Sequence, residues 1–465
     1  MLDFLSIKFD YVIVLFLCAI LAILCTNKYE FPWLAEAIPE KMPNIFDPNL
    51  KAELIFESEI KREGGTLSPV TTMAFLGLND ILMLDKNHGT VNRIVNGVLL
   101  EHPLIDVSVA NKRERGLLGI DTFLSSKSSS NKTQYVFLYY TESVKDGNDV
   151  CPVSYYCEPG NDPIGNRLYR YEINGNKLAN PKLLLDLPAL PGPIHNGGVV
   201  KVGPDNNVYV TIGDVLGYTK HYSQTRSLNF KNGTEPDGRA GILRVNIDGK
   251  SVNEKGILGD KDFLKFYYAY GIRNSFGIDF DPVSGKLWDT ENGPDYGDEI
   301  NIVEPGFNSG WNKVQGYWVP MYNESRGGDF IPGAKISSQE GNRFEDFGGK
   351  GKYSRPEFTW NQTAGPTAIK FLETDIYGKE YKNDLLVADI NNGYLYHFNL
   401  NKDRTGLSLP EPLKDKIANN LDELKGVILG DHFGVITDMD IGPDGYLYIL
   451  SHHKNNAEIF KIMLK

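Results

Sequence analysis

Clusters of basic residues are missing from this 465-residue sequence. Its 48 lysines and arginines are outnumbered by 60 aspartates and glutamates, so the formal net charge is −12. Nucleic-acid binding depends on grouped Lys and Arg side chains that contact phosphates, so no nucleic-acid partner is expected. A small or neutral ligand agrees better with this charge.

Motifs of several common enzyme classes are absent as well. The sequence has no Gly-x-Gly-x-x-Gly after a strand, no Walker loop, no His-Glu-x-x-His and no Gly-x-Ser-x-Gly. These motifs bind dinucleotides, nucleotide phosphates or zinc, or carry a nucleophilic serine. The usual signals of a nicotinamide or nucleotide enzyme, a zinc protease or a serine hydrolase are therefore lacking.

Cysteine is scarce, with four residues in two pairs. Cys18 and Cys25 lie in an apolar N-terminal segment, whereas Cys151 and Cys157 bracket a short loop. We expect the second pair to form a disulfide if the domain is exported to an oxidising compartment. Two reduced cysteines are the alternative.

Long apolar runs are limited to one, at residues 11–25. Its length matches a signal-peptide core better than the roughly 20 residues of a full membrane span, yet no small-x-small cleavage site follows. We expect residues 1–28 to be a signal peptide or membrane anchor and 29–50 a proline-rich linker, with a domain at 51–465 on the extracellular or periplasmic side. A buried helix of the domain is the alternative for the apolar run.

Helical periodicity is lacking in the remainder of the chain, and turns recur instead. The 47 glycines, 25 prolines and 25 tyrosines are typical of short strands joined by tight turns. Strand-and-turn units begin at Gly203 and Gly442, and Asn-Gly and Asp-Gly turns end at Gly175 and Gly249. The pattern predicts an all-β fold of repeated small antiparallel sheets: a propeller, a sandwich or a barrel.

A histidine and an aspartate flank one of the predicted strands. His195 begins the segment His-Asn-Gly-Gly, and Asp214 ends the strand at residues 208–214. A histidine held by a carboxylate is a suitable base for taking a proton from an alcohol near neutral pH. A loop histidine and an unrelated turn aspartate are the alternative, because spacing alone does not establish contact.

Two further polar clusters follow. Arg273 and Asn274 open a strand between glycines, where an arginine can stabilise developing negative charge. Acids and turn carbonyls are dense at residues 291–301, and calcium takes six to eight oxygen ligands of these kinds. For Arg273, a surface or ion-paired arginine is the alternative. The acidic cluster predicts a calcium site, and an ordinary acidic turn is its alternative.

Taken together and in order, six motifs resemble the soluble pyrroloquinoline-quinone-dependent glucose and aldose sugar dehydrogenases of the glucose/sorbosone dehydrogenase family. The motifs are Arg113-Glu114-Arg115-Gly116-Leu-Leu-Gly, His195-Asn-Gly-Gly, Gly213-Asp214, Gly238-Arg-Ala-Gly-Ile-Leu-Arg244, Gly271-Ile-Arg273-Asn274, and the segment from Gly293-Pro294 to Gly310-Trp311. The resemblance extends from about Leu54 to the C-terminus. It implies a six-bladed β-propeller with the quinone on its top face, the sugar above the quinone and calcium beside it.

The resemblance also implies a role for each matched residue. His195 would be the general base, Asp214 its orienting partner, and Arg273 would polarise the quinone carbonyl that accepts hydride. Asn274 would contact the cofactor, and Glu114 would lie near the sugar. The carbonyls of Gly293 and Pro294 would hold the catalytic calcium, and Asp298, Glu299 and the backbone near Ser309 would form a second, structural calcium site. Electrons would leave to an acceptor that the sequence does not identify.

The sequence departs from the family where the quinone carboxylates bind. Asn391 and Thr437 occupy cofactor-binding positions where well-known members have lysine or arginine. Each lost contact from a charged donor to a carboxylate forfeits about 1.5–3 kcal/mol unless another group substitutes. The histidines at 397, 432, 452 and 453 are candidates to do so.

Two alternatives to the dehydrogenase therefore stay open. One is a calcium-stabilised propeller that has lost the quinone and acts in binding or as a scaffold. The other is a propeller hydrolase such as a lactonase, whose calcium lies in the central channel. A loop rich in glycine and polar residues at 320–356 is expected to form a top-face insertion that shapes access to the site.

Overall fold

A computed structural model describes residues 42–60, 69–125, 133–144, 163–215, 224–323, 329–336, 343–453 and 455–465. Within these residues the strands form six sheets of four or more strands and one two-stranded hairpin. The helices described are 3-10 turns of three to six residues: η2 (Arg226–Leu228), η3 (Asp262–Phe266), η6 (Leu413–Asp415) and η7 (Leu421–Gly426). The predicted all-β class is confirmed.

The first three sheets follow one another along the chain. The first contains β3 (Val70–Gly77), β4 (Asp80–Asp85), β5 (Thr90–Val95), β6 (Val98–Leu99) and β7 (Ile105–Asp106). The second contains β8 (Leu117–Ser125), β9 (Thr133–Ser143), β10 (Pro163–Asn174) and β11 (Lys177–Leu187). The third contains β12 (Val200–Val202), β13 (Asn207–Ile212), β14 (Gly241–Asn246), β15 (Tyr267–Tyr270), β19 (Phe307–Asn308) and β22 (Lys352–Tyr353).

The other three sheets include strands from distant parts of the chain. The fourth contains β16 (Ser275–Phe280), β17 (Leu287–Glu291), β18 (Asp298–Val303), β23 (Phe358–Trp360) and β27 (Ile417–Ala418). The fifth contains β24 (Pro366–Phe371), β25 (Leu385–Asp389), β26 (Leu395–Phe398), β28 (Ile428–Asp431) and β1 (Asn44–Ile45). The sixth contains β29 (Val435–Ile441), β30 (Leu447–His453), β31 (Asn456–Leu464) and β2 (Leu50–Glu59).

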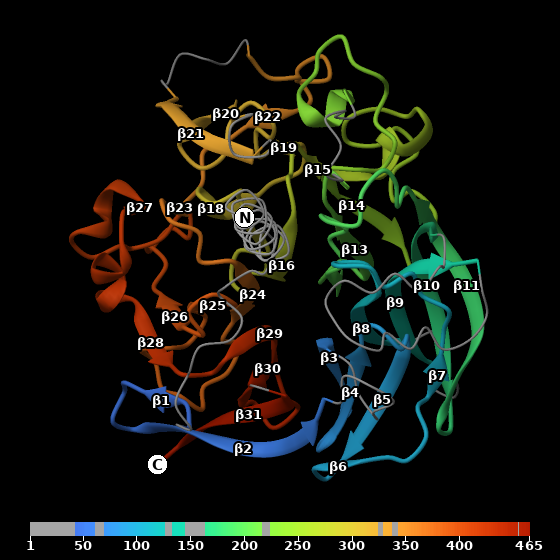
Figure 1. Cartoon of the computed structure of the whole chain (residues 1–465), viewed down its shortest axis with the longest axis vertical. Coiled ribbons are helices and arrows are strands. Elements are labelled where there is room, and N and C mark those ends of the chain that lie inside the picture. Colours follow the sequence, from blue (N-terminus) through green and yellow to red (C-terminus); the bar gives the residue numbers. More distant parts are fainter. Residues whose placement is uncertain are drawn as a thin grey trace, which may run out of the picture. The chain divides into compact units, whose positions relative to one another are not determined.

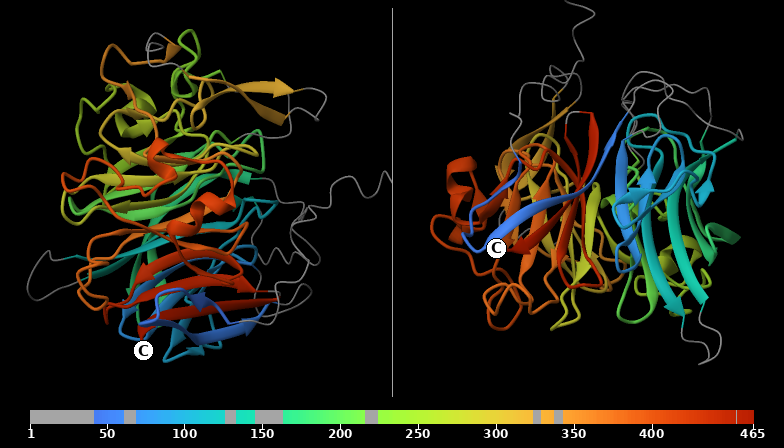
Figure 2. Two further views of the ribbon diagram at one scale, coloured as in Figure 1. Left: turned by 90° about the vertical axis from the view of Figure 1, so that its left-hand side faces the viewer. Right: turned by 90° about the horizontal axis from the view of Figure 1, so that it is seen from below.

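These sheets are arranged around a common centre (Figure 1), and Figure 2 shows them packed face to face. The innermost strands β3, β8, β12, β16, β24 and β29 each contact the innermost strands of the two neighbouring sheets. Contacts between β29 and β3 close the ring. The predicted β-propeller is thereby confirmed over the sandwich and the barrel.

The last sheet is built from both ends of the described chain. β2 pairs antiparallel with β31, from Leu50 opposite Leu464 to Glu59 opposite Asn456. β1 pairs with β28, so the end of the predicted linker belongs to the propeller. The predicted anchor at 1–28, the rest of the linker, and Cys151 and Cys157 lie outside the described residues. None of the helices in the described part has the length and hydrophobicity that crossing a membrane requires.

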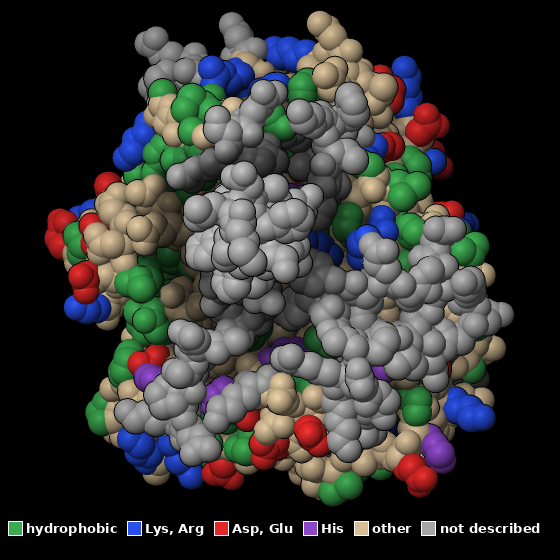
Figure 3. All heavy atoms as spheres, viewed as in Figure 1, with side chains coloured by type: hydrophobic (Ala, Val, Ile, Leu, Met, Phe, Trp, Pro, Cys, Tyr) green, Lys and Arg blue, Asp and Glu red, His purple; other side chains and the backbone are tan. Residues whose placement is uncertain are grey.

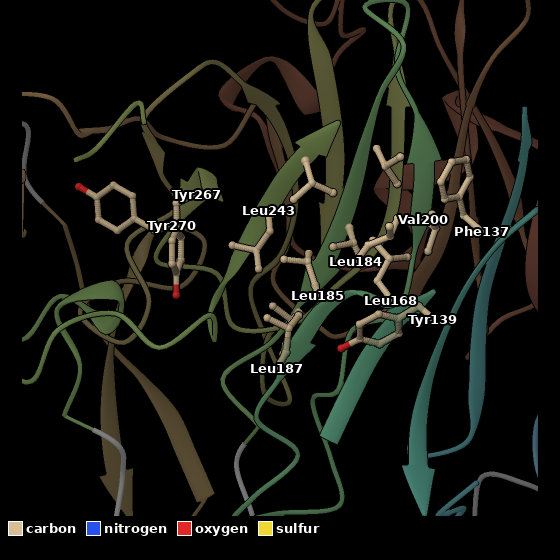
Figure 4. Close-up of a cluster of buried hydrophobic side chains, with 14 of the residues drawn as sticks. Phe137, Tyr139, Leu168, Leu184, Leu185, Leu187, Val200, Leu243, Tyr267 and Tyr270 are labelled. Atoms are coloured by element: carbon tan, nitrogen blue, oxygen red, sulfur yellow. The ribbon is translucent and has the colours of Figure 1, made fainter. Parts of the chain in front are cut away.

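Apolar side chains fill the space between neighbouring sheets. Figure 4 shows one such cluster between the second and third sheets, which includes Tyr139, Leu168, Leu185 and Leu243. Leu168 and Leu243 are fully buried. Burial of each such side chain contributes about 1.5–3 kcal/mol to stability, so the sheets hold their places by packing against one another.

Charged side chains line the channel at the centre of the ring. A cavity of about 50 Å³ there is lined by residues of all six innermost strands. Lys201 of β12 lies 3.4 Å from Asp279 of β16, and Lys370 of β24 lies 3.8 Å from Asp279 and 2.9 Å from Asp440 of β29. These ion pairs connect four consecutive sheets around the channel.

The predicted insertion at 320–356 contributes a hairpin. β20 (Trp318–Asn323) pairs with β21 (Asp329–Lys335) as a sheet of its own. Its Phe330 packs edge-on against Trp311, with ring centroids 5.1 Å apart. The insertion therefore contacts Trp311, whose indole N–H also donates to Asp214.

Candidate active site

The predicted site residues come from turns at one end of the propeller. His195 lies before β12 and Arg273 before β16, where innermost strands begin. Asp214 follows β13, and Gly293 lies between β17 and β18. In an antiparallel sheet the start of the first strand and the end of the second lie at the same edge. These turns therefore meet at one mouth of the channel.

The structure brings the predicted pair His195 and Asp214 into contact. Nδ1 of His195 lies 2.6 Å from Oδ1 of Asp214, and the indole N–H of Trp311 donates to Oδ2 over 2.8 Å. Burial alone would raise the pKa of Asp214, but the charge of and hydrogen bond to His195, together with Arg273 and Trp311, lower it overall. Asp214 is thus a carboxylate that accepts a hydrogen bond from the N–H at Nδ1 of His195.

The other ring nitrogen of His195 is therefore the one with a lone pair. The residue is 5% exposed, and no described residue forms a hydrogen bond with its Nε2. His195 has a φ of +60°, in the left-handed region, so its backbone is held in a conformation that few residues other than glycine adopt. A strained backbone at such a position is characteristic of functional sites.

Arg273 lies beside this pair. The backbone N–H of Asp214 donates to the Arg273 carbonyl over 2.9 Å, and the Arg273 guanidinium lies 5.6 Å from the centre of the Trp311 ring. Its Nη1 donates to the carbonyl of Asn292 over 2.7 Å, whereas Nε is buried without a hydrogen-bond partner. An unsatisfied buried donor of this kind is costly unless a ligand accepts from it.

Glu114 and Asn274 connect the second, third and fourth sheets around His195. One oxygen of Glu114, Oε2, accepts the backbone N–H of His195 over 2.5 Å and the Asn274 amide over 3.3 Å. Oδ1 of Asn274 accepts the backbone N–H of Gly197 over 3.1 Å. Glu114, expected near the sugar, therefore also fixes the backbone that carries the predicted base.

The turn of Gly293 and Pro294 is anchored by Asp298. Oδ1 of Asp298 accepts the Gly293 N–H over 2.8 Å, and Oδ2 accepts from Thr363, Ala364 and Gly365 over 2.7–2.9 Å. No N–H or O–H of a described residue donates to the carbonyls of Gly293 and Pro294. The two carbonyls remain available as ligands. Both Asp298 oxygens accept hydrogen bonds, and the metal-ligand role expected for Asp298 stays a prediction.

Three buried carboxyl groups lie together on β17 and β18. Glu291 is directly opposite Glu299, and Asp289 is opposite Asn301. The hydroxyl of Ser309 lies 2.5 Å from a Glu291 oxygen and 3.1 Å from Glu299. Burial raises the pKa of Asp289 to about 7 and that of Glu299 to about 8, and burial and the Glu299 charge raise the pKa of Glu291.

This cluster lacks compensating positive charge among the groups that contact it. Both carboxylate oxygens of Asp289 are buried without a hydrogen-bond partner. No three His, Cys, Asp or Glu side chains of the described residues are arranged as a ready-made metal centre. The donors are nonetheless the oxygens that calcium prefers.

The predicted cofactor-binding positions of the last two sheets carry no charge. Asn391 donates to the carbonyl of Thr363 over 3.2 Å, and the hydroxyl of Thr437 lies 3.4 Å from the carbonyl of Leu450. Figure 3 shows histidine side chains on the face of the molecule seen in Figure 1. The four histidines considered as substitutes each have a partner.

Three of the four histidines have a carboxylate partner, and the fourth has a backbone carbonyl. His397 bonds Asp384, His432 lies 2.6 Å from Asp431, and His453 lies 3.7 Å from Glu458. Nε2 of His452 lies 2.7 Å from the carbonyl of Val70, and burial lowers the pKa of His452. His452 is therefore a neutral donor at pH 7 rather than a cation.

Three residues around the site carry roles that the sequence patterns did not assign. Trp311 contacts Asp214, and Glu291 accepts the backbone N–H of Arg273 over 2.6 Å. Lys86, in the turn after β4, has its pKa lowered to about 7 by burial, against the opposing charges of Glu114 and Asp85. The contacts of Trp311 and Glu291 join residues 97 and 18 positions apart, so no local spacing indicates them.

The propeller thus brings a histidine, a carboxylate and an arginine together at one mouth of its channel. The family model for glucose/sorbosone dehydrogenase matches residues 67–461. The chain belongs to this family and is an enzyme of the sugar dehydrogenase type.

Relatives agree with this assignment. An uncharacterized protein of Synechocystis, slr1608, is 22% identical over 408 residues, or 84% of this chain and 82% of that protein. Quinoprotein glucose dehydrogenase B of Acinetobacter calcoaceticus is 34% identical over 162 residues, 32% of each chain. Aldose sugar dehydrogenase YliI of Escherichia coli is 26% identical over 221 residues, 48% of this chain and 50% of that protein. The last two alignments thus span half or less of those enzymes.

Solved structures share the fold. The soluble aldose sugar dehydrogenase of Escherichia coli, in its apo-form, superimposes with a TM-score of 0.61 at 19% identity, covering 90% of this chain and 100% of that one. The PQQ-bound aldose sugar dehydrogenase of Streptomyces coelicolor gives a TM-score of 0.56 at 20% identity, covering 91% and 100%.

Proposed function

We propose that the chain is a quinoprotein that oxidises a hydroxyl group of an aldose sugar, with pyrroloquinoline quinone as the oxidant and calcium beside it. The contact of 2.6 Å between Nδ1 of His195 and the ionised Asp214 carries this proposal. It leaves Nε2 of His195 as a base at the mouth of the channel. The names of the quinoprotein and aldose dehydrogenase relatives support the substrate and the oxidant.

In this reaction the residues of the chain handle the proton and the charge. Nε2 of His195 takes the hydroxyl proton of the sugar, while Asp214 keeps the ring oriented and stabilises the imidazolium that forms. Arg273, with its unpartnered Nε, presents positive charge at the same mouth. The quinone, when bound, would accept the hydride that the sugar carbon loses.

The described residues fit the reactive end of such a cofactor. Arg273 and Asn274 offer donors there, and the carbonyls of Gly293 and Pro294 offer ligands for the catalytic calcium. At the other end Asn391 and Thr437 would bind as neutral groups. We expect weaker binding of the quinone than in relatives with cations at these positions.

A second calcium is proposed at the buried carboxyl cluster. Asp298, Glu299 and the backbone at Ser309 are its expected ligands, and Glu291 lies directly opposite Glu299. A divalent cation would stabilise carboxylates that burial otherwise drives toward protonation. Asp298 would also support the first site, because it holds the turn of Gly293 and Pro294.

The proposal also includes a propeller of six blades and export of the domain. Six sheets of four or more strands, each with an innermost strand in the ring, support a six-bladed propeller. Residues 1–28 would export the domain or hold it at the membrane, which places it on the extracellular or periplasmic side.

The experiment that tests this function is a titration of the purified domain with pyrroloquinoline quinone in a buffer that contains calcium. Binding is followed by quinone absorbance, and turnover by aldose-dependent reduction of a dye, in wild type and His195→Ala. We expect binding in both proteins and a fall in turnover of about 10²–10⁴-fold in His195→Ala. Absence of binding at micromolar quinone would favour the alternative, a calcium-stabilised propeller without the quinone, which the neutral Asn391 and Thr437 support.

A further inference from the structure

The loop that carries His195 is held by side chains from other parts of the chain. This loop, residues 188–195, is the first part of the connection from β11 to β12. Nδ2 of Asn166 donates to the carbonyl of Pro188 over 2.9 Å, and Nη1 of Arg239 donates to the carbonyl of Leu190 over 3.3 Å. Side-chain donors thus replace the strand pairing that the loop lacks.

Arg115 makes the most extensive of these contacts. Its Nη2 donates to the carbonyl of Ala189 over 2.5 Å and to that of Gly192 over 2.9 Å. The guanidinium therefore bridges the two ends of the turn at residues 189–192. The two N–H groups of this one nitrogen, held in the plane of the guanidinium, fix the distance between two carbonyls that lie three and six residues before His195.

This arginine is buried without a carboxylate partner. Arg115 is 7% exposed, its Nε is buried without a hydrogen-bond partner, and it forms no ion pair with a described residue. Burial lowers its pKa to about 10, so it stays charged at neutral pH. A buried charge without a counter-charge is costly for stability, and costly charges of this kind cluster at functional sites.

The neighbouring Glu114 holds the same loop from the other side. The backbone N–H of Glu114 donates to the carbonyl of Pro193 over 3.2 Å, and its Oε2 accepts the backbone N–H of His195 over 2.5 Å. Glu114 and Arg115 belong to one turn, before β8. This turn therefore contacts the loop on both sides of Pro193, immediately before the proposed base.

We infer that Arg115 is a positioning residue for His195: by bridging the carbonyls of Ala189 and Gly192 it sets the backbone from which the imidazole reaches Asp214. This inference rests on the proposed function for its catalytic consequence, but the placement of the ring is a property of the protein alone. A displacement of about 1 Å in a catalytic group can lower the rate about 10²-fold.

Two substitutions test the bridge. Arg115→Met removes the charge and leaves both carbonyls without this donor, whereas Arg115→Lys keeps the charge but lacks the planar fork. The matched control is Arg404→Met. Arg404 is also partly buried and donates to Asp281 over 2.6 Å and to the carbonyl of Asn383 over 2.7 Å, contacts that do not involve the His195 loop.

The decisive readout is the His195 ring itself in the protein without cofactor. Histidine is labelled with 13C at Cε1, the His195 signal is assigned by its loss in His195→Asn, and its chemical shift is followed from pH 5 to 9. We expect a changed shift and titration in Arg115→Met, a smaller change in Arg115→Lys and none in Arg404→Met. Both methionine variants should lose thermal stability.

Kinetics of the loaded enzyme provide the second readout. We expect Arg115→Met to lower kcat about 10–100-fold with little change in KM, and Arg115→Lys to recover part of this loss. The inference is overturned if Arg115→Met loses stability as Arg404→Met does but keeps the His195 titration of wild type. If Arg115→Met does not fold, Arg115→Lys is used instead, and the inference is overturned if that variant keeps the His195 titration of wild type. A wild type without dehydrogenase activity would refute the proposed function and leave the NMR test of Arg115 intact.

Discussion

The indole N–H of Trp311 donates to Oδ2 of Asp214 over 2.8 Å, while Oδ1 of the same carboxylate contacts His195. The aspartate is 2% exposed, so these two contacts largely replace water at its oxygens. Trp311 in turn packs against Phe330 of the β20–β21 hairpin. A chain of contacts thus runs from the insertion to the proposed base.

Trp311→Phe should therefore impair catalysis more than stability. A hydrogen bond to a charged acceptor contributes about 1.5–3 kcal/mol, so we expect kcat to fall about 10-fold or more with a small change in KM. The measurement is steady-state dye reduction beside thermal unfolding. Trp288→Phe is the control, because Trp288 is fully buried and its Nε1 has no hydrogen-bond partner. Equal effects of the two substitutions on kcat would contradict the prediction.

Gly213→Ala should disrupt the site through the backbone. A Cβ at Gly213 would lie 2.6 Å from the carbonyl oxygens of both His195 and Arg273. Because backbone must move to relieve this overlap, we expect kcat/KM to fall about 10²-fold while the circular dichroism spectrum is kept. At Gly77 a Cβ meets no atom within 4 Å, so Gly77→Ala should leave kcat/KM as in wild type.

Lys370→Met should destabilise the propeller at neutral pH. It removes the cation between Asp279 and Asp440. Breaking a fully buried pair costs about 3–5 kcal/mol; we expect a smaller loss here, because the Asp440 side chain is 28% exposed and Lys201 still pairs with Asp279. Chemical denaturation measures this change. Lys425→Met is the control, since Lys425 and its partner Asp422 are exposed, and no measurable effect is expected.

The loss in Lys370→Met should shrink in acid. Burial alone would raise the pKa of Asp440, but the charges of Lys370 and Lys201 lower it overall. A lowered pKa in the folded state contributes stability above the unfolded value of 3.8, and this contribution is lost as pH falls through the folded pKa. Wild type should therefore lose stability below about pH 4 more steeply than the variant does. Parallel pH profiles would show that Lys370 does not set this pKa.

Calcium should raise the melting temperature of the domain, and chelation should lower it. At a free concentration of 100 times Kd a bound ion contributes about 2.7 kcal/mol. We expect Glu299→Gln to weaken this response, because it removes a buried carboxylate of the proposed structural site. Glu304→Gln, which changes an exposed side chain, should respond like wild type. A calcium response that is the same in all three proteins would place the ion elsewhere.

Much of the fold could be predicted because its signals are local. The turns at Gly203 and Gly442 join the strands β12 to β13 and β29 to β30, as their sequences predict. The order of sheets around the channel is not a local property. The choice of a propeller over a sandwich or a barrel followed from the resemblance of ordered motifs to a known family, not from periodicity.

For the site, the sequence indicated some contacts and missed others. His195 and Asp214 lie in contact as expected, because each flanks a strand of the same sheet. The contact of Trp311 with Asp214 joins residues 97 positions apart, and that of Arg115 with Gly192 joins residues 77 apart. Such contacts depend on how neighbouring sheets pack. Asp298 likewise accepts the backbone N–H of Gly365, 67 positions away, which its acidic motif does not indicate.

The pairing of β2 with β31 has a consequence for biosynthesis. The N-terminal strand leaves the ribosome first but finds its partner only when residues 456–464 have been made. Until then β2 is an unpaired edge, open to wrong partners on other nascent chains. Because these hydrogen bonds join the two ends of the described chain, the sixth sheet can form in full only after residues 456–464 have been synthesised.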